Sequence, residues 1–240
     1  MTIKHELRKF LWKFGYDIYR LTPQNNTLLK RKQLFESYKI DTVLDIGANA
    51  GQYAKQLRSK IGYNGLILSF EPLSTAYAHL KESANNDTAW KVFNMAIGDL
   101  EEKKEINIAG NSYSSSFLSM LPSHFKSAPN SKYIGKEEID IKPLDSLFGD
   151  LCGSAKNIYM KIDTQGYESK VLKGAENSLP RISTVQMEMS LIPLYDGERL
   201  FHEMCALMSD KGYTLVAIEN GFSDPTSGQL LQVDGIFHRM

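Results

Sequence analysis

Short apolar runs alternate along the chain with stretches whose apolar residues recur at helical spacing. The runs end in glycine, proline or polar residues, which is the pattern of strands buried in a sheet. Such alternation is typical of βαβ units with a parallel sheet. We predict strands near 42–46, 65–70, 90–95, 157–162, 184–189, 213–219 and 230–238, and helices near 28–38, 50–60, 74–84, 167–178 and 198–211.

The end of the chain departs from this alternation. Only segment 220–228, rich in Gly, Ser, Asp and Pro, joins the last two predicted strands. Parallel neighbours need a long crossover, whereas a short loop joins antiparallel strands. We therefore predict an α/β fold with a seven-stranded, mostly parallel sheet, a reversed C-terminal strand and helices on both faces.

Segment 103–141 interrupts the alternation as a lid-like insertion. Long loops inside a compact domain are usually lids or binding loops, or else are disordered. Serine hydroxyls suit a polar substrate such as a sugar, and a histidine in a lid is a candidate base; a solvated loop without a special role is the alternative. The insertion holds strand-like runs at 104–109 and 137–141 and, between them, Ser114, Ser115, Ser116 and His124.

The first 27 residues form a separate element, an amphipathic helix and a linker ahead of a domain at 28–240. Apolar residues recur at helical spacing between 3 and 21, and basic residues fill the other faces. Charges interrupt the segment too often for a secretory signal. Such a helix either docks on its own domain or on a second subunit of a homo-oligomer, or lies on an anionic membrane surface.

Composition narrows the partners and the compartment. The 240 residues include 28 Lys and Arg and 28 Asp and Glu, so the chain has no net charge. Proteins that track phosphates normally carry a basic excess, so we predict no nucleic-acid partner. Cys152 and Cys205 lie in no metal or redox spacing, which favours a reducing compartment. No apolar run reaches the length of a membrane span. We expect a cytoplasmic protein, with peripheral contact to the inner face of the membrane through residues 3–21 as the open alternative.

A glycine-punctuated turn follows the first predicted strand. Gly47 and Gly51 remove side chains where the chain must bend and admit a ligand, and a helix starting there presents free backbone N–H groups to the crevice. A dinucleotide fingerprint needs G-x-G-x-x-G, whereas here Asn49 lies between glycines four apart. Glu71 ends the second strand, where a carboxylate can accept hydrogen bonds from both ribose hydroxyls. Turn and acid together favour S-adenosylmethionine, an adenosine ligand without a diphosphate.

Acidic residues follow the later strands, at the edge where ligands bind in open parallel sheets. Asp163 is predicted either to take the proton from the hydroxyl that accepts the methyl group of S-adenosylmethionine, or to hydrogen-bond the amino group of that donor or backbone N–H groups of the following turn. Glu168 falls in the first turn of the next helix, where the macrodipole favours an acid with or without a function. Glu188, at the end of the neighbouring strand, is a third candidate facing the same crevice. The histidines show no metal-ligand spacing, so we predict no metal.

Read in order, the motifs of this chain resemble the FkbM family of S-adenosylmethionine-dependent methyltransferases. The resemblance covers about residues 40–239, nearly everything except the N-terminal helix. It rests on VLDIGANAGQYA at 43–54, FEP at 70–72, AIGD at 96–99, SYSSS at 112–116, KIDTQGYESKVLKGA at 161–175 and VDGIFHR at 233–239.

The resemblance implies a Rossmann-like methyltransferase fold and places the donor. The methionine part is expected on the turn, Glu71 on the ribose, and two residues near the adenine. One departure is Gln165, where the family commonly has Glu; a charge needed there for substrate or metal binding is lost or moves to Glu168. The expected donor contacts on the turn and near the adenine are Asp45, Gly47, Asn49, Gly51, Ala96 and Asp99.

The family further implies an O-methyltransferase of glycan, glycolipid or secondary-metabolite pathways. We therefore expect a hydroxyl of a sugar-like small molecule or glycan as the acceptor. Two alternatives remain open from the sequence: an NAD-type oxidoreductase that uses the same turn, and a noncatalytic Rossmann-like scaffold or binding module.

Overall fold

The computed structural model describes residues 3–240, so the first two residues of the predicted N-terminal segment lie outside the described part. The chain forms two compact units, residues 1–37 and 38–240. In the described range no helix has the length and apolar character of a membrane span.

The first unit contains α1 (Ile3–Trp12) and α2 (Thr27–Ser37). The prediction of helical structure as far as residue 21 is wrong. Gly15 has a left-handed φ of 78°, and the N–H of Tyr16 donates to the carbonyl of Leu11. This glycine cap ends α1 although the apolar spacing continues beyond it.

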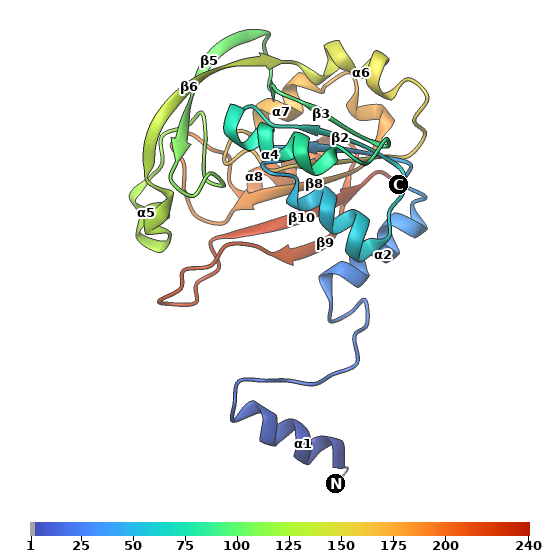
Figure 1. Ribbon diagram of the computed structural model, residues 1–240, viewed down its shortest axis with the longest axis vertical. Helices are drawn as coiled ribbons and strands as arrows, with labels where there is room; N and C mark the ends of the chain where they lie inside the picture. The colour runs from blue at the N-terminus through green and yellow to red at the C-terminus, as the bar shows by residue number, and fades with distance from the viewer. Residues whose placement is uncertain (1–2) are drawn as a thin grey trace. The chain divides into compact units, whose positions relative to one another are not determined.

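The second unit is built on the predicted seven-stranded sheet, whose strands can be followed in Figure 1. Its strand order is β3-β2-β1-β7-β8-β10-β9, and β10 pairs antiparallel with both β8 and β9. The mostly parallel sheet with a reversed C-terminal strand is therefore confirmed. The strands are β1 (Thr42–Ile46), β2 (Leu66–Phe70), β3 (Trp90–Phe93), β7 (Ile158–Ile162), β8 (Ile182–Ser190), β9 (Thr214–Asn220) and β10 (Gln232–His238).

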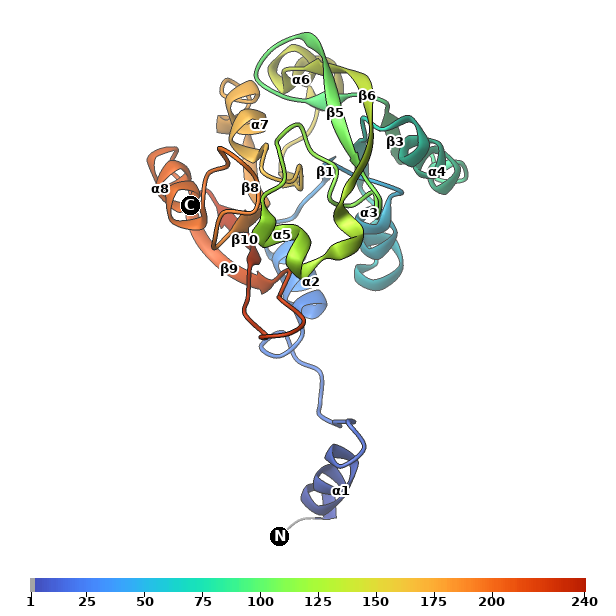
Figure 2. The same cartoon turned by 90° about the vertical axis from the view of Figure 1, so that its left-hand side faces the viewer.

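Helices cover both faces of this sheet. Figure 2 shows α3 (Gln52–Gln56) and α4 (Ser74–Ala84) on one side, with α7 (Glu168–Gly174) and α8 (Phe201–Asp210) on the other. The predicted helix at 50–60 consists of α3 and a wider π-helical turn, Leu57–Ile61, closed by a left-handed glycine. The predicted helix at 167–178 ends at Gly174.

Two α-helices in the described part of the chain were not predicted, the short α5 (Pro122–Ser127) in the insertion and α6 (Leu144–Cys152). The helix α6 follows Pro143 and packs its apolar side into the same core as α7 and α8.

Both ends of the insertion form strands, which join a short strand just before it in a second, three-stranded sheet. The strands β4 (Ala96–Ile97), β5 (Glu102–Ala109) and β6 (Tyr133–Lys142) lie in the order β4-β6-β5. Both strand-like runs of the insertion are confirmed and extend further than predicted. The loop between β5 and β6 holds the short helix α5 (Pro122–Ser127) and the serine-rich tract.

The central strands carry a row of polar residues in an otherwise apolar interior. All residues of β1 and β7 are buried, as expected where helices cover both faces of parallel strands. In the sheet register Asp45 lies opposite Ser69 on β2 and Lys161 on β7, and Lys161 lies opposite Gln186 on β8. Residues paired across neighbouring strands face the same side, so these four form one continuous polar row.

Candidate functional site

A cavity of about 250 Å³ lies at the carboxyl ends of the central strands. Part of its wall is apolar and comes from β2, the second sheet and the loops beside them. Seven of the predicted site residues line it: Gly47, Asn49, Glu71, Ala96, Ser115, Asp163 and Glu188.

The backbone conformation and the close packing of the first turn require both of its glycines. Gly47 has φ 79°, and a Cβ there would lie 1.9 Å from the carbonyl oxygen of Asp163. Gly51 has φ 82°, and its Cβ would lie 2.8 Å from the ring of Trp90. Any other residue would therefore meet both a strained backbone and a neighbouring group. The left-handed φ of both glycines confirms the predicted bend, and both also let the turn approach β7 and β3; that the turn admits a ligand stays a prediction, with Gly47 on the cavity wall.

The backbone N–H groups of residues 47–51 are already paired. Two donate to the carbonyl of Phe70 and one to that of Ala48. The Asn49 N–H donates to Glu71 and the Ala50 N–H to the side chain of Asn49. The N–H groups of the turn itself are therefore occupied. The predicted free N–H groups belong to the start of the following helix, α3, which begins at Gln52, and they stay a prediction.

Glu71 supplies an acceptor at the end of β2. Its carboxylate accepts the N–H groups of Asn49 at 2.8 Å and Leu73 at 2.9 Å, which fix its orientation. The side chain is buried, and burial raises its pKa to about 7, although both N–H groups lower it. Each carboxylate oxygen has a further lone pair, so the group can also accept two hydroxyls from a ligand.

Aromatic and aliphatic side chains form the apolar part of the cavity. Phe70, Ile97, Phe117 and Tyr167 line it. The Phe117 and Tyr167 rings are 4.7 Å apart, and the ammonium of Lys104 lies 5.6 Å from the centre of each. This part of the cavity suits a flat, uncharged ring system.

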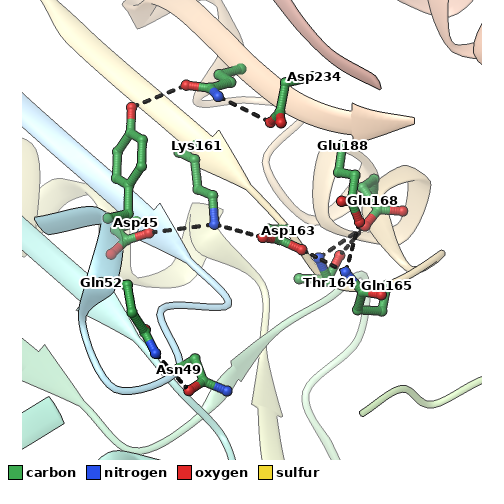
Figure 3. A network of polar contacts seen from close by, with 12 residues as sticks. Asp45, Asn49, Gln52, Lys161, Asp163, Thr164, Gln165, Glu168, Glu188 and Asp234 are labelled. Carbon is green, nitrogen blue, oxygen red and sulfur yellow. Dashed lines mark hydrogen bonds and ion pairs between the residues drawn. The ribbon is translucent and has the colours of Figure 1, made fainter. Parts of the chain in front are cut away.

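The polar row reaches the cavity through Lys161 (Figure 3). Its ammonium lies 2.9 Å from Asp163 and 4.0 Å from Asp45. Burial lowers the pKa of Lys161, but the charges of Asp163 and Asp45 outweigh it and raise the pKa overall. Asp45 is fully buried behind the cavity, and burial raises its pKa despite Lys161. Lys161 thus fixes Asp163 at the cavity wall through an ion pair.

Gln165 joins the two carboxylates that line this wall. Its Nε2 donates to Asp163 at 2.8 Å and to Glu188 at 2.7 Å, and its Oε1 accepts the hydroxyl of Tyr195 at 2.7 Å. The backbone of Gln165 is left-handed, with φ 55°. Burial raises the pKa of Glu188 well above its usual range, and the charge of Asp163 adds to this shift.

Glu168 braces the loop that carries these groups. It accepts the Thr164 N–H at 2.9 Å, the Thr164 hydroxyl at 3.1 Å and the Gly166 N–H at 3.3 Å. Burial raises its pKa to about 7. Its side chain does not line the cavity, so its contacts are those of a residue that shapes the loop.

The serine-rich tract crosses over the first turn and over Gln165. Ser112 accepts a hydrogen bond from Asn49 at 3.2 Å, and Tyr113 accepts one from Gln52 at 3.2 Å. The Ser116 hydroxyl donates to the Gln165 carbonyl at 2.7 Å. The loop between β5 and β6 is therefore held by hydrogen bonds both to the first turn and to the loop after β7.

The remaining predicted site residues lie outside the cavity wall. The Asp99 carboxylate accepts Lys170 and Lys173 at 3.0 and 3.1 Å, which ties α7 to the end of β4. His124 is buried against the rings of Tyr195 and Phe222, and burial lowers its pKa to about 4. The residues outside the wall are Asp45, Gly51, Asp99, Glu168, Ser114, Ser116 and His124.

Two residues that organise the site were missed from the sequence. The role of Lys161 was predictable, because a lysine inside the apolar run of a strand that is covered on both faces needs a buried anion as its partner. Tyr195 had none, because it lies in a loop and reaches Gln165 only through the folded chain.

Comparison with known proteins identifies the family of this domain. A profile of the Methyltransferase FkbM domain matches residues 45–215. A crystal structure of Methyltransferase FkbM from Methylobacillus flagellatus KT aligns with 82% of this chain and 43% of its own, at 14% identity and a TM-score of 0.48. The chain thus spans less than half of that protein. Aeropyrum pernix fibrillarin with natively bound S-adenosyl-L-methionine aligns with 81% of this chain and 66% of its own, at 10% identity and a TM-score of 0.45.

No curated protein matches the sequence. The matched domain covers most of the chain and contains the turn, the acid after β2 and the loop after β7. It favours a methyl donor over the nicotinamide cofactor that the sequence left open. The chain belongs to the FkbM family of S-adenosylmethionine-dependent methyltransferases.

Proposed function

We propose that this protein transfers a methyl group to a hydroxyl of a sugar-like acceptor. The observation that carries the proposal is the pair of acids on the cavity wall, Asp163 and Glu188, joined by the Gln165 amide. Methylation of a hydroxyl releases a proton, and a carboxylate beside the acceptor can take it.

The cavity fits the adenosine part of the donor. The buried carboxylate of Glu71, held by two N–H groups, is oriented to accept ribose hydroxyls, and the apolar part around Phe117 and Tyr167 suits the adenine. Asn49 and Gly47 line the side from which the methionine part would be held. When bound, S-adenosylmethionine supplies an electrophilic methyl group.

The two acids have different surroundings and are assigned different roles. Both oxygens of Asp163 are engaged, one by Lys161 and one by Gln165, so Asp163 orients the acceptor hydroxyl. Glu188 accepts the amides of Gln165 and Gln232 at one oxygen, Oε2. Burial and the Asp163 charge raise its pKa, which makes its ionised form a stronger base than an ordinary carboxylate. Glu188 is therefore the proposed proton acceptor.

The rim of the cavity supports a polar acceptor. Ser112, Tyr113 and Ser115 line it from the loop between β5 and β6. The Ser115 hydroxyl also accepts the Ala109 N–H and donates to the Ser112 carbonyl, which holds its oxygen in place. A rim of hydroxyl groups with a fixed geometry suits an acceptor that carries several hydroxyls.

The test uses S-adenosylmethionine with a carbon-13-labelled methyl group and fractionated glycans, glycolipids and small molecules. The carbon-13 chemical shift of the product distinguishes an O-methyl from an N-methyl group. We expect an O-methyl product with wild-type protein, and turnover reduced about 10²-fold or more by Glu188→Gln because the proton acceptor is lost.

The matched control is Glu198→Gln. Glu198 is also an acid with a pKa raised by burial, but it does not line the cavity. Product from the control with little product from Glu188→Gln supports the assignment. An N-methyl product contradicts O-methylation, and full turnover by Glu188→Gln removes Glu188 from proton transfer.

A further inference from the structure

Large apolar side chains are concentrated on the surface of the N-terminal segment. Of the fourteen exposed large hydrophobic residues in the described part of the chain, eight fall between residues 7 and 21. Five of these eight are aromatic. The exposed residues are Leu7, Phe10, Trp12, Phe14, Tyr16, Ile18, Tyr19 and Leu21, between 48% and 68% exposed.

The same segment concentrates positive charge. Residues 1–21 hold five Lys or Arg and two Asp or Glu, a net charge of +3. The rest of the chain holds the other 23 basic and 26 acidic residues, a net charge of −3. A chain with no net charge thus carries its basic excess where its apolar side chains are exposed.

Local contacts order these side chains. The rings of Phe10 and Phe14 are 5.2 Å apart, and the Arg8 guanidinium lies 5.3 Å from the centre of the Trp12 ring. Arg8 also pairs with Asp17 at 2.6 Å. The chain therefore folds back after α1, and the aromatic residues on both sides of the turn belong to one ordered element.

We propose that residues 3–21 bind the surface of an anionic lipid bilayer. Trp and Tyr carry a polar atom on an apolar ring, which suits the boundary between headgroups and acyl chains. Basic residues next to such rings are attracted to anionic headgroups. Pairing with the same segment of a second copy is less favourable, because two segments of charge +3 repel each other.

The experiment is flotation of the full-length protein with phosphatidylcholine vesicles, with and without phosphatidylglycerol. We expect binding that requires phosphatidylglycerol and weakens as salt is raised. Trp12→Ala/Phe14→Ala should reduce the partition coefficient at least about tenfold, because two rings leave the interface. Lys9→Gln/Lys13→Gln should reduce it about thirtyfold.

Matched controls change similar side chains outside the segment. Leu100→Ala/Ile134→Ala removes two large side chains that are 57% and 73% exposed, and Lys55→Gln/Lys91→Gln removes two exposed charges. Both should leave the partition coefficient within about twofold of wild type.

Light scattering and S-adenosylhomocysteine binding complete the design. Donor binding by each variant shows that it is folded. Absence of vesicle binding by the wild type, or equal losses in variants and controls, overturns the proposal. A dimer that forms without lipid and is lost in Trp12→Ala/Phe14→Ala would instead assign the segment to a second copy of the chain, which also overturns it.

Discussion

Glu71→Gln tests the cofactor site through its pH dependence. The Glu71 pKa of about 7 means that its charge changes between pH 5.5 and 7.5. Ribose hydroxyls donate to the ionised carboxylate, so ligand binding favours the deprotonated form and affinity must rise with pH. If only that form binds, the Kd of S-adenosylhomocysteine is about 25-fold higher at pH 5.5 than at pH 7.5.

The variant should lose both affinity and pH dependence. At pH 7.5 the loss of a charged acceptor for two hydroxyls costs about 1.5–3 kcal/mol, or roughly 10- to 150-fold in Kd. At pH 5.5 the wild-type carboxyl is mostly protonated, so the gap between the two proteins should largely close. Isothermal titration calorimetry at constant ionic strength measures each Kd.

Glu168→Gln is the matched control. Glu168 also has a pKa of about 7 through burial, but it does not line the cavity. This variant should keep the pH dependence of the wild type. A wild-type Kd that changes less than about threefold over this range, or an unchanged dependence in Glu71→Gln, would refute the reasoning.

Three further substitutions test the architecture by urea denaturation. Lys161→Ala should destabilise the fold by about 3–5 kcal/mol, because it leaves Asp45 as an unpaired buried charge; Asp45→Leu/Lys161→Met should recover most of this loss, and no recovery would contradict the pairing. Gln165→Glu adds an acid beside Asp163 and Glu188, and repulsion should raise the pKa of the new carboxyl in the folded protein. The free energy of unfolding of this variant should therefore fall as pH rises, with a loss of about 2 kcal/mol relative to wild type at pH 8 and a smaller loss at pH 5.5. A loss that does not depend on pH would argue against repulsion. Gly47→Ala should cost about 3 kcal/mol or more and abolish donor binding, whereas Gly62→Ala, at φ 77° with open space around its Cβ, should cost about 1 kcal/mol; equal costs would contradict the close approach of Gly47 to Asp163.

The sheet was predictable because its strands are covered on both faces. A run such as Val43–Ile46 is apolar enough to identify a buried strand without knowledge of its neighbours. The reversed last strand was predictable from the short polar connection before it. Both inferences use only local composition and spacing.

The errors arose where local spacing and chain geometry disagree. The apolar spacing of the N-terminal segment continues to Leu21, but Gly15 ends the helix. The helix α6 was predictable from its apolar spacing. Its sequence has apolar residues at helical spacing after a proline: Leu144, Leu147, Phe148 and Leu151.

The candidate site was predictable only in part. Glu71 and Asp163 follow directly from their places at strand ends. The hydrogen bonds that occupy the N–H groups of the first turn depend on Phe70 and Glu71 from another strand. No single segment contains that information, so the sequence could not show that the N–H groups of this turn are occupied.

The row of polar side chains across β2, β1, β7 and β8 also decides how these strands align. Apolar strands that are buried on both faces could shift in register by two residues and still keep apolar side chains on each face. Such a shift would move Lys161 away from Asp45 and leave two opposite charges unpaired in the buried interior, at a cost of several kcal/mol. The ion pair between Lys161 and Asp45 thus fixes the register of β7 against β1. The same register brings the loops after β1, β2 and β7 together around the cavity.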